Sequence, residues 1–371
     1  MDHSKFRKKA EALLAAANVR VNGNRPWDIQ IHNDTFFERV LAEGSLAVGE
    51  TYMEGWWDCD QLDEFFHLVL RAGIDRKVQS WKNYLDIVEA IIFNLQKPSR
   101  AYQIGKHHYD RGNHLYELML DKLMTYSCGY WKDAADLDEA QQQKIDLVAC
   151  KLKLEPGMHV LDIGCGWGGA AYHLARNYDV HVTGVTVSGK QAQYGRELNR
   201  GLPVDIRLQD YRELNGSFDR IYSIGMFEHV GYKNYRDFMQ VASRNLKDNG
   251  YFVLHCIGSN VSVYKTDPWI QKYIFPNSMI PSARQLTRSA EELFMIEDWQ
   301  NFGPDYDKTL MAWSRNFRRH WSALKQQYST EFYRMWLYYL LASAGSFRAR
   351  RNQLWQVVFS KGFNGRYDAP R

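Results

Sequence analysis

The 371-residue chain lacks the cysteine patterns of a disulfide-stabilised or zinc-stabilised protein. Its five cysteines are scattered, and none belongs to a C-x-x-C pair: Cys59, Cys128, Cys150, Cys165 and Cys256. Disulfide frameworks and structural zinc sites both need recurring, suitably spaced cysteines. We therefore expect neither of them and no metal centre, and this cysteine usage fits a reducing cytoplasm.

Long apolar runs are also lacking. The longest apolar stretch, Met335 to Phe347, falls short of the roughly 20 residues that a membrane-spanning helix needs. Hydrophobic residues make up 45% of the chain and charged residues 24%, which is ordinary for a globular protein and excludes a disordered or collagen-like one. The length favours two or three domains.

Acidic residues are scarce near the end of the sequence. Residues 308–371 carry 12 basic and 2 acidic side chains, and many aromatic residues lie among them. This mixture suits an anionic membrane surface or a nucleic acid, or it forms the solvated rim of a packed helix pair. Because no nucleic-acid-binding motif accompanies it, we expect no nucleic-acid partner, and the other two interpretations stay open.

From about residue 155 onward, strand and helix patterns alternate. Short apolar runs predict buried strands at 159–166, 181–187, 204–210, 218–225 and 250–258, with a final strand at 354–360. Helical patterns fall between most of these strands and again at 305–326 and 330–350. The alternation predicts a doubly wound parallel sheet.

The first 75 residues differ in pattern from the rest. They contain two helical patterns, a strand-like stretch at 27–33 and a glycine- and tryptophan-rich stretch at 44–66. A further helical pattern at 78–96 ends before Pro98. We expect a small N-terminal domain at 1–75, a helical linker at 76–105 and a large α/β domain at 106–371 with an insertion at 259–294.

The glycine-rich loop LDIGCGWGG, residues 161–169, lies between a predicted strand and a helix. Gly164 and Gly166 permit a tight turn, and free N–H groups at the start of the helix can hold a polar ligand. Dinucleotide-binding loops share this pattern. Asp162, two residues before the first of these glycines, instead favours S-adenosylmethionine, because a carboxylate there can meet the ligand's ammonium group.

The second predicted strand lacks a terminal acidic residue, which would usually bind ribose hydroxyl groups. Thr186 and Gln191 can substitute as neutral hydrogen-bonding groups. The third strand ends at Asp210 and Tyr211, where Asp210 either accepts from an adenine amino group or is only a turn residue. The missing acid and Asp162 both argue against a nicotinamide cofactor.

Taken with other motifs, these features resemble the cyclopropane-fatty-acyl-phospholipid synthases, a family that includes the mycolic acid cyclopropane synthases. The similarity covers nearly the whole chain. The matching stretches, in order, are HYDRGN (108–113), YSCGYW (126–131), VLDIGCGWGG (160–169), GVTVS (184–188), QDYR (209–212), GMFEHVG (225–231), HCIGS (255–259), DPWIQKYIFPN (267–277) and NFGPDYDKTLMAW (301–313).

The resemblance implies a class I S-adenosylmethionine-dependent methyltransferase domain, which is Rossmann-like, with a small, mostly helical, lipid-associated domain before it. It implies transfer of a methylene group from S-adenosylmethionine to the cis double bond of an unsaturated phospholipid acyl chain. It also implies a cytoplasmic enzyme, peripherally associated with the inner face of the membrane, and a homodimer.

Site residues follow from the same resemblance. A bound bicarbonate ion would act as the general base, held by the main chains of Cys128 and Ile257 and the side chains of Glu228, His255 and Tyr306. Tyr126 and Ser127 would lie near the carboxylate of S-adenosylmethionine. Its remaining contacts would be Asp162, Gly164, Gly166, Gly168, Thr186, Gln191, Asp210 and Tyr211.

One position departs from some relatives, which carry a cysteine where this chain has Ser343. We expect that thiol to be dispensable, because methylation of an alkene needs no covalent enzyme intermediate. Three other functions stay open: a methyltransferase that makes a methyl-branched lipid or a methylated small amine, a nicotinamide-dependent oxidoreductase, and a lipid-binding protein without catalysis.

Overall fold

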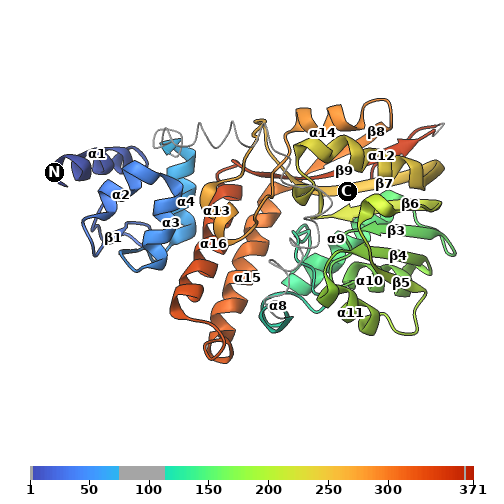
Figure 1. The fold of residues 1–371 in the computed structure, drawn as a ribbon, viewed down its shortest axis with the longest axis horizontal. Coiled ribbons are helices and arrows are strands. Elements are labelled where there is room, and N and C mark those ends of the chain that lie inside the picture. Colours follow the sequence, from blue (N-terminus) through green and yellow to red (C-terminus); the bar gives the residue numbers. More distant parts are fainter. Residues whose placement is uncertain (1–2, 75–112, 363–364) are drawn as a thin grey trace. The chain divides into compact units, whose positions relative to one another are not determined.

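The computed structural model describes residues 3–74, 113–362 and 365–371, and the chain divides into two compact units (Figure 1). One unit combines Met1–Phe93 with Tyr264–Asn277 and Tyr306–Asn352, and the other combines Asn94–Val263 with Ser278–Asp305 and Gln353–Arg371. The expected linker at 76–105 and most of the motif at 108–113 lie outside the described residues.

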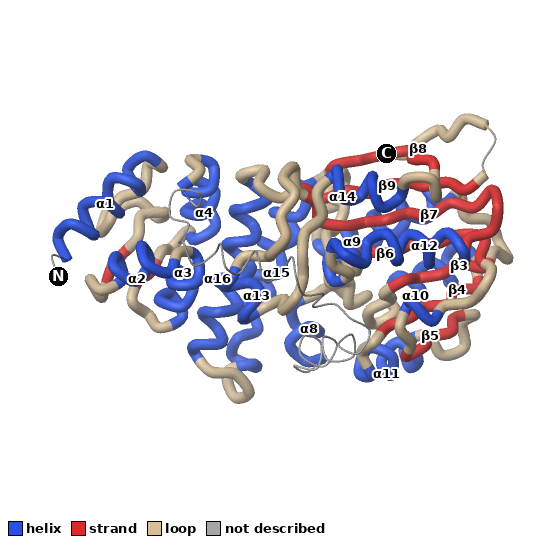
Figure 2. The backbone as a smooth tube through the Cα atoms, turned by 45° about the horizontal axis from the view of Figure 1, so that its top comes forward, coloured by secondary structure: helices blue, strands red, loops and turns tan. Residues whose placement is uncertain are grey.

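The second unit is built on a seven-stranded sheet in the order β5-β4-β3-β6-β7-β9-β8 (Figure 2). Five strands are parallel: β3 (His159–Ile163), β4 (His181–Thr186), β5 (Val204–Leu208), β6 (Phe218–Ile224) and β7 (Leu246–Gly258). β9 (Gln353–Lys361) runs antiparallel between β7 and β8 (Met295–Asn301). The predicted parallel sheet and final strand are confirmed, whereas β8 was not predicted.

Helices cover both faces of this sheet (Figure 2). α9 (Leu137–Leu152), α10 (Gly169–Tyr178) and α11 (Gly189–Leu198) contribute to one apolar cluster, and α12 (Tyr235–Asn245) and α14 (Ala283–Ala290) contribute to the other. A short helix, α8 (Asn113–Met119), precedes them. Burial on both faces explains why the parallel strands read as continuous apolar runs. The expected Rossmann-like class I fold is confirmed.

The strand order reverses at β3. β4 and β5 lie on one side of β3, while β6 and β7 lie on the other. In open α/β sheets, such a reversal leaves a crevice at the carboxyl ends of the strands, where ligands bind. A ligand is therefore expected to contact the residues that follow β3, β4 and β6.

The first unit is mostly helical. It contains α1 (His3–Ala16), α2 (Phe36–Glu43), α3 (Ser45–Met53), α4 (Leu62–Arg71), α13 (Pro268–Tyr273), most of α15 (Gly303–Leu324) and α16 (Thr330–Arg348). Two short strands, β1 (Gln30–Ile31) and β2 (Trp57–Asp58), pair antiparallel. Aromatic rings fill its core: the Tyr338 ring centroid lies 4.4 Å from that of Trp269 and 5.2 Å from that of Phe66.

Residues from the two ends of the sequence share this core. The Arg348 guanidinium on α16 forms ion pairs with Asp307 on α15 and with Asp63 and Glu64 on α4, at N–O distances of 2.8–3.0 Å. Arg334 donates to the Trp57 carbonyl at 2.9 Å. The compact units therefore differ from the boundaries expected at 1–75 and 106–371, because side chains far apart in sequence pack together. The division into independent domains stays a prediction.

Trp57 belongs to the core of the first unit. It is fully buried, and its ring contacts those of Phe36, Tyr52 and Phe65 at centroid distances of 5.1–6.0 Å. Its neighbour Trp56 is half-buried.

Among the described helices, none is both long and apolar enough to cross a membrane.

Gly345 on α16 provides a test of this packing. A Cβ atom there would lie 2.5 Å from the Asp63 carbonyl oxygen and 2.7 Å from Phe66 Cβ, both on α4. Alanine gains about 1 kcal/mol over glycine in helix propensity, but overpacking costs about 1–3 kcal/mol. Because a backbone atom is the obstacle, we expect Gly345→Ala to lower the free energy of unfolding by about 1–2 kcal/mol in urea titrations.

Ser343→Ala, at a half-buried position on the same helix, is the matched control. It should leave stability and most of the activity unchanged. A more stable Gly345→Ala protein would show that α4 and α16 leave room for a methyl group at this position.

Candidate active site

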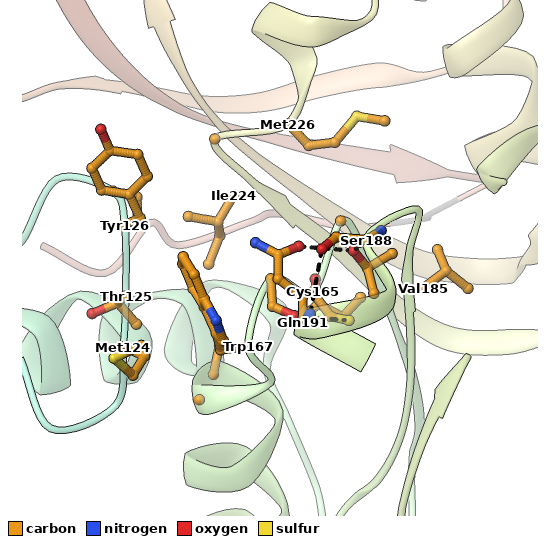
Figure 3. Close-up of a pocket in the computed structure, with 18 of the residues that line it drawn as sticks. Met124, Thr125, Tyr126, Cys165, Trp167, Val185, Ser188, Gln191, Ile224 and Met226 are labelled. Atoms are coloured by element: carbon orange, nitrogen blue, oxygen red, sulfur yellow. Dashed lines mark hydrogen bonds between the residues drawn. The ribbon is translucent and has the colours of Figure 1, made fainter. Parts of the chain in front are cut away.

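A cavity of about 160 Å³ lies where β3, β4 and β6 end (Figure 3). It is lined by eight of the residues expected to hold S-adenosylmethionine: Tyr126, Ser127, Asp162, Gly164, Gly166, Thr186, Gln191 and Tyr211. Gly168 and Asp210 are not among the lining residues. The sequence prediction and the topology thus point to the same place in the fold.

The glycine loop forms one wall of the cavity. Gly164 has φ +94°, which a residue with a Cβ rarely adopts, and a Cβ there would lie 2.6 Å from Met226 Cγ. The N–H groups of Gly164 and Cys165 donate to the Val185 carbonyl at 3.0 and 2.9 Å, which ties the loop to β4. The loop backbone is thereby held against the cavity in a conformation that depends on glycine.

Asp162 is a buried carboxyl group in this wall. Its residue is 2% exposed, and burial raises its pKa to about 7. The neighbouring Tyr222 hydroxyl and the charge of Lys144 oppose this rise in pKa without cancelling it. A carboxyl group with this pKa binds a cationic ligand group best when it is ionised.

The end of β4 and the start of α11 supply neutral groups to the cavity. Thr186 Oγ1 donates to Gln191 Oε1 at 2.9 Å, and Ser188 Oγ caps α11 by accepting from the Gln191 N–H. This pair can exchange hydrogen bonds with hydroxyl groups. Both carboxylate oxygens of Asp210 already accept from the Arg212 side chain, at 2.9 and 2.6 Å.

Glu228 follows β6 in a short 3₁₀ turn, Phe227–His229. Its Oε1 accepts from the main-chain N–H of Ile257 at 2.7 Å, and its Oε2 has no hydrogen-bond partner among the described residues. Burial raises the Glu228 pKa to about 7. The structure therefore brings Glu228 and Ile257 together, with the Ile257 N–H already engaged.

His255 lies on β7, two residues before Ile257. It is buried, and burial together with the charges of Lys144 and Lys151 lowers its pKa well below the usual value, so the ring is neutral. Its Nδ1 lies 3.3 Å from the Gln356 amide nitrogen, which can donate to it in the tautomer that carries the ring proton on Nε2. That Nε2 finds no partner in the described part of the chain.

The other two expected bicarbonate ligands, Cys128 and Tyr306, form contacts of their own. Cys128 is fully buried in the segment that precedes α9, where its thiol donates to the Gly129 carbonyl. Tyr306 belongs to the first unit, where its ring lies 4.6 Å from that of Phe347 and 6.0 Å from that of Trp313. Nowhere in the described ranges do three or more His, Cys, Asp or Glu side chains gather as a metal site would need.

Sequence reasoning missed one cavity residue of opposite charge. Lys144 lies on α9 and lines the cavity, although it is only 1% exposed. Its neighbours Gln141, Ile145 and Val148 on the same helix are also buried. A lysine within the buried stripe of a helix was the available signal, because lysine is almost never fully buried without a partner.

The chain is similar to characterised enzymes over most of its length. A family profile described as mycolic acid cyclopropane synthetase matches residues 96–357. A curated cyclopropane-fatty-acyl-phospholipid synthase from Escherichia coli (strain K12) is 55% identical over 354 residues, which cover 95% of this chain and 93% of the relative. The chain belongs to the mycolic acid cyclopropane synthetase family.

Solved structures of family members agree with this assignment. The cyclopropane synthase MmaA2 from Mycobacterium tuberculosis is 30% identical with a TM-score of 0.67, over 72% of this chain and all of that one. The mycolic acid cyclopropane synthase CmaA1, complexed with SAH and CTAB, is 32% identical with a TM-score of 0.66, over 70% of this chain and 98% of that one. The family resemblance and the expected class of enzyme, an S-adenosylmethionine-dependent transferase, are confirmed.

Asp162 leads to a prediction about cofactor affinity. Because its pKa is raised to about 7, its carboxylate is largely protonated at pH 5.5 and ionised above pH 7. We expect the affinity for S-adenosylhomocysteine, measured by calorimetry, to rise between pH 5.5 and 7.5. Asp162→Asn should abolish this dependence and weaken binding at pH 7.5 by about 10- to 100-fold, since a charged hydrogen bond contributes about 1.5–3 kcal/mol.

Asp205→Asn removes an exposed carboxylate on β5 and is the control. An Asp162→Asn protein with unchanged affinity would exclude Asp162 from the ammonium contact.

Proposed function

We propose that this family member transfers a methylene group from S-adenosylmethionine to the cis double bond of unsaturated phospholipid acyl chains, forming cyclopropane fatty acids. The observation that carries the proposal is the 55% identity, across 95% of the chain, to the E. coli cyclopropane-fatty-acyl-phospholipid synthase. The cavity at the end of the sheet supports it with a site suited to the cofactor.

The residues of this cavity fit S-adenosylmethionine. Asp162 would receive its ammonium group, and Thr186 and Gln191 its ribose hydroxyl groups. Aromatic side chains in the wall can stabilise its positive sulfur through their ring faces: Tyr126, Trp167, Tyr211 and Tyr222. When bound, the cofactor supplies an electrophilic methyl group. Holding an alkene in line with that methyl is the main task of the protein, because alkenes are weak nucleophiles.

Bicarbonate is a further part of the proposal. Glu228 Oε2 and His255 Nε2 have no hydrogen-bond partner among the described residues, and as an acceptor and a donor they suit an ion that both donates and accepts hydrogen bonds. A bound bicarbonate would supply the base that takes the last proton from the added methyl group. The His255 Nε2 proton would be donated to the ion, and Glu228 would accept from it. The Ile257 N–H, now bonded to Glu228, would have to be shared with the ion.

The substrate would be reached at a membrane surface. We propose peripheral association with the inner face of the cytoplasmic membrane, by attraction between anionic lipids and exposed basic side chains on α15: Arg315, Arg318 and Arg319. Each basic residue near such a surface contributes about 1 kcal/mol. The burial of Trp57 favours this electrostatic contact over insertion of that side chain. The homodimer stays a prediction of the family resemblance.

Vesicles test the function directly. The protein is incubated with S-adenosylmethionine and anionic vesicles of cis-unsaturated phospholipid, and the acyl chains are analysed for mass and remaining unsaturation. We expect a gain of one carbon and two hydrogens with loss of the double bond. The yield should fall as salt rises, since salt screens attraction to the surface.

Retained unsaturation with the same gain in mass would instead indicate a methylene-bearing product. Reaction with small amines and none with vesicles would indicate an amine methyltransferase.

Glu228 provides a test of the bicarbonate site. Depleting bicarbonate should slow turnover, and adding it back should restore the rate. Because Glu228 holds the ion that acts as the base, Glu228→Gln should lower kcat by up to about 10²- to 10⁴-fold, the contribution of a general base, with little change in cofactor affinity. Glu213→Gln, at an exposed carboxylate, is the control and should keep the normal rate. A rate that is unaffected by depletion would mean that a side chain is the base.

A further inference from the structure

Lys144 is held at the cavity by its helix and by the segment that precedes that helix. Its Nζ donates to Ser127 Oγ at 2.8 Å. One turn earlier on α9, the Gln141 amide donates to the main-chain carbonyl of Ser127 at 2.8 Å and to that of Thr125 at 3.3 Å. The positions of Lys144 and Ser127 are therefore fixed relative to each other.

The ammonium group of Lys144 is under-satisfied. It has three N–H donors, but Ser127 Oγ is its one hydrogen-bond acceptor within the described chain, and no carboxylate there forms an ion pair with it. Burial of an ammonium group without a counter-charge is unfavourable. Accordingly, burial lowers the Lys144 pKa to about 8. Lys144 is one of the residues that line the cavity.

The charged and titratable groups near Lys144 do not provide this missing acceptor. Asp121 contributes a favourable charge, but its carboxylate accepts from the N–H groups of Leu123 and Thr125 and from the Thr125 hydroxyl. Asp162 and the Cys128 thiol lie near enough to affect its pKa, and His255 is neutral. A negatively charged ligand group would complete the site.

We propose that Lys144 is a further residue of the cofactor site and binds the α-carboxylate of S-adenosylmethionine, beside Ser127, which the family resemblance already implies to lie near that carboxylate. The inference rests on the proposed use of that cofactor. The cavity then presents a carboxylate, Asp162, and an ammonium, Lys144, to the two charges of the ligand's amino-acid group. By donating to Ser127 Oγ, Lys144 also orients the Ser127 hydroxyl so that its proton is free for the same carboxylate.

Decarboxylated S-adenosylmethionine tests this assignment, because it lacks only the carboxylate. Calorimetry would compare its Kd with that of S-adenosylmethionine in each variant. We expect Lys144→Met to weaken binding of S-adenosylmethionine by about 10- to 100-fold, as for loss of a charge-assisted hydrogen bond, and to leave the decarboxylated ligand within about threefold. Lys144→Arg keeps the charge and should restore part of the preference.

Lys151→Met is the matched control. Lys151 is a second buried lysine on α9, but it pairs with Asp298 at 3.4 Å and with Gln300 at 2.7 Å. Its loss should leave the ratio of the two Kd values unchanged. Ser127→Ala is a second variant, with a partial loss of preference expected, and it carries the test if Lys144→Met does not fold.

The outcomes separate the two proposals. Equal weakening of both ligands by Lys144→Met, or no change in either, would overturn the carboxylate assignment while S-adenosylmethionine binding by the unaltered protein stands. Binding of neither ligand by the unaltered protein would overturn the proposed function and the carboxylate site with it.

Discussion

Burial of charge at the carboxyl end of the sheet is the constraint around which the second unit is arranged. Asp162 and Glu228 are each withdrawn from water, and this burial raises their pKa values to about 7. In the described part of the chain, no cation forms an ion pair with either of them. Lys144 is buried in the same region, with its pKa lowered to about 8. Buried charged groups destabilise a fold unless an opposite charge or a hydrogen bond compensates for their loss of water. A ligand that carries both a positive and a negative group can compensate buried carboxylates and a buried ammonium at the same time.

The fold makes this burial possible through topology. β3 continues into a loop that depends on glycine, and the strand order reverses on either side of it. Helices on both faces exclude water from the strands. Asp162 therefore projects from a rigid strand into a crevice, rather than from a mobile surface loop. A rigid support of this kind lowers the cost of orienting groups around a reacting centre.

Much of this was predictable from local sequence. Parallel strands buried on both faces leave apolar runs, and the glycine loop leaves a spacing of glycines and an aspartate. β8 left neither signal, because Met295–Asn301 is a partly exposed edge strand with charges at Glu297 and Asp298. The association of α16 with α4 depends on contacts between residues more than 270 apart, such as Arg348 with Glu64. Periodicity carries no information about contacts of that kind.

The two buried lysines of α9 look alike in the sequence, and only the structure distinguishes their partners. Both lie on the buried side of one helix, seven residues apart, and burial lowers both pKa values to about 8. Asp298 neutralises Lys151, and Arg371 holds that carboxylate in turn, so the chain itself supplies the partner. Lys144 has Ser127 Oγ instead of a carboxylate, and it faces a cavity. The same residue type in the same helix thus has its partner within the chain at one position and is left for a ligand at the other.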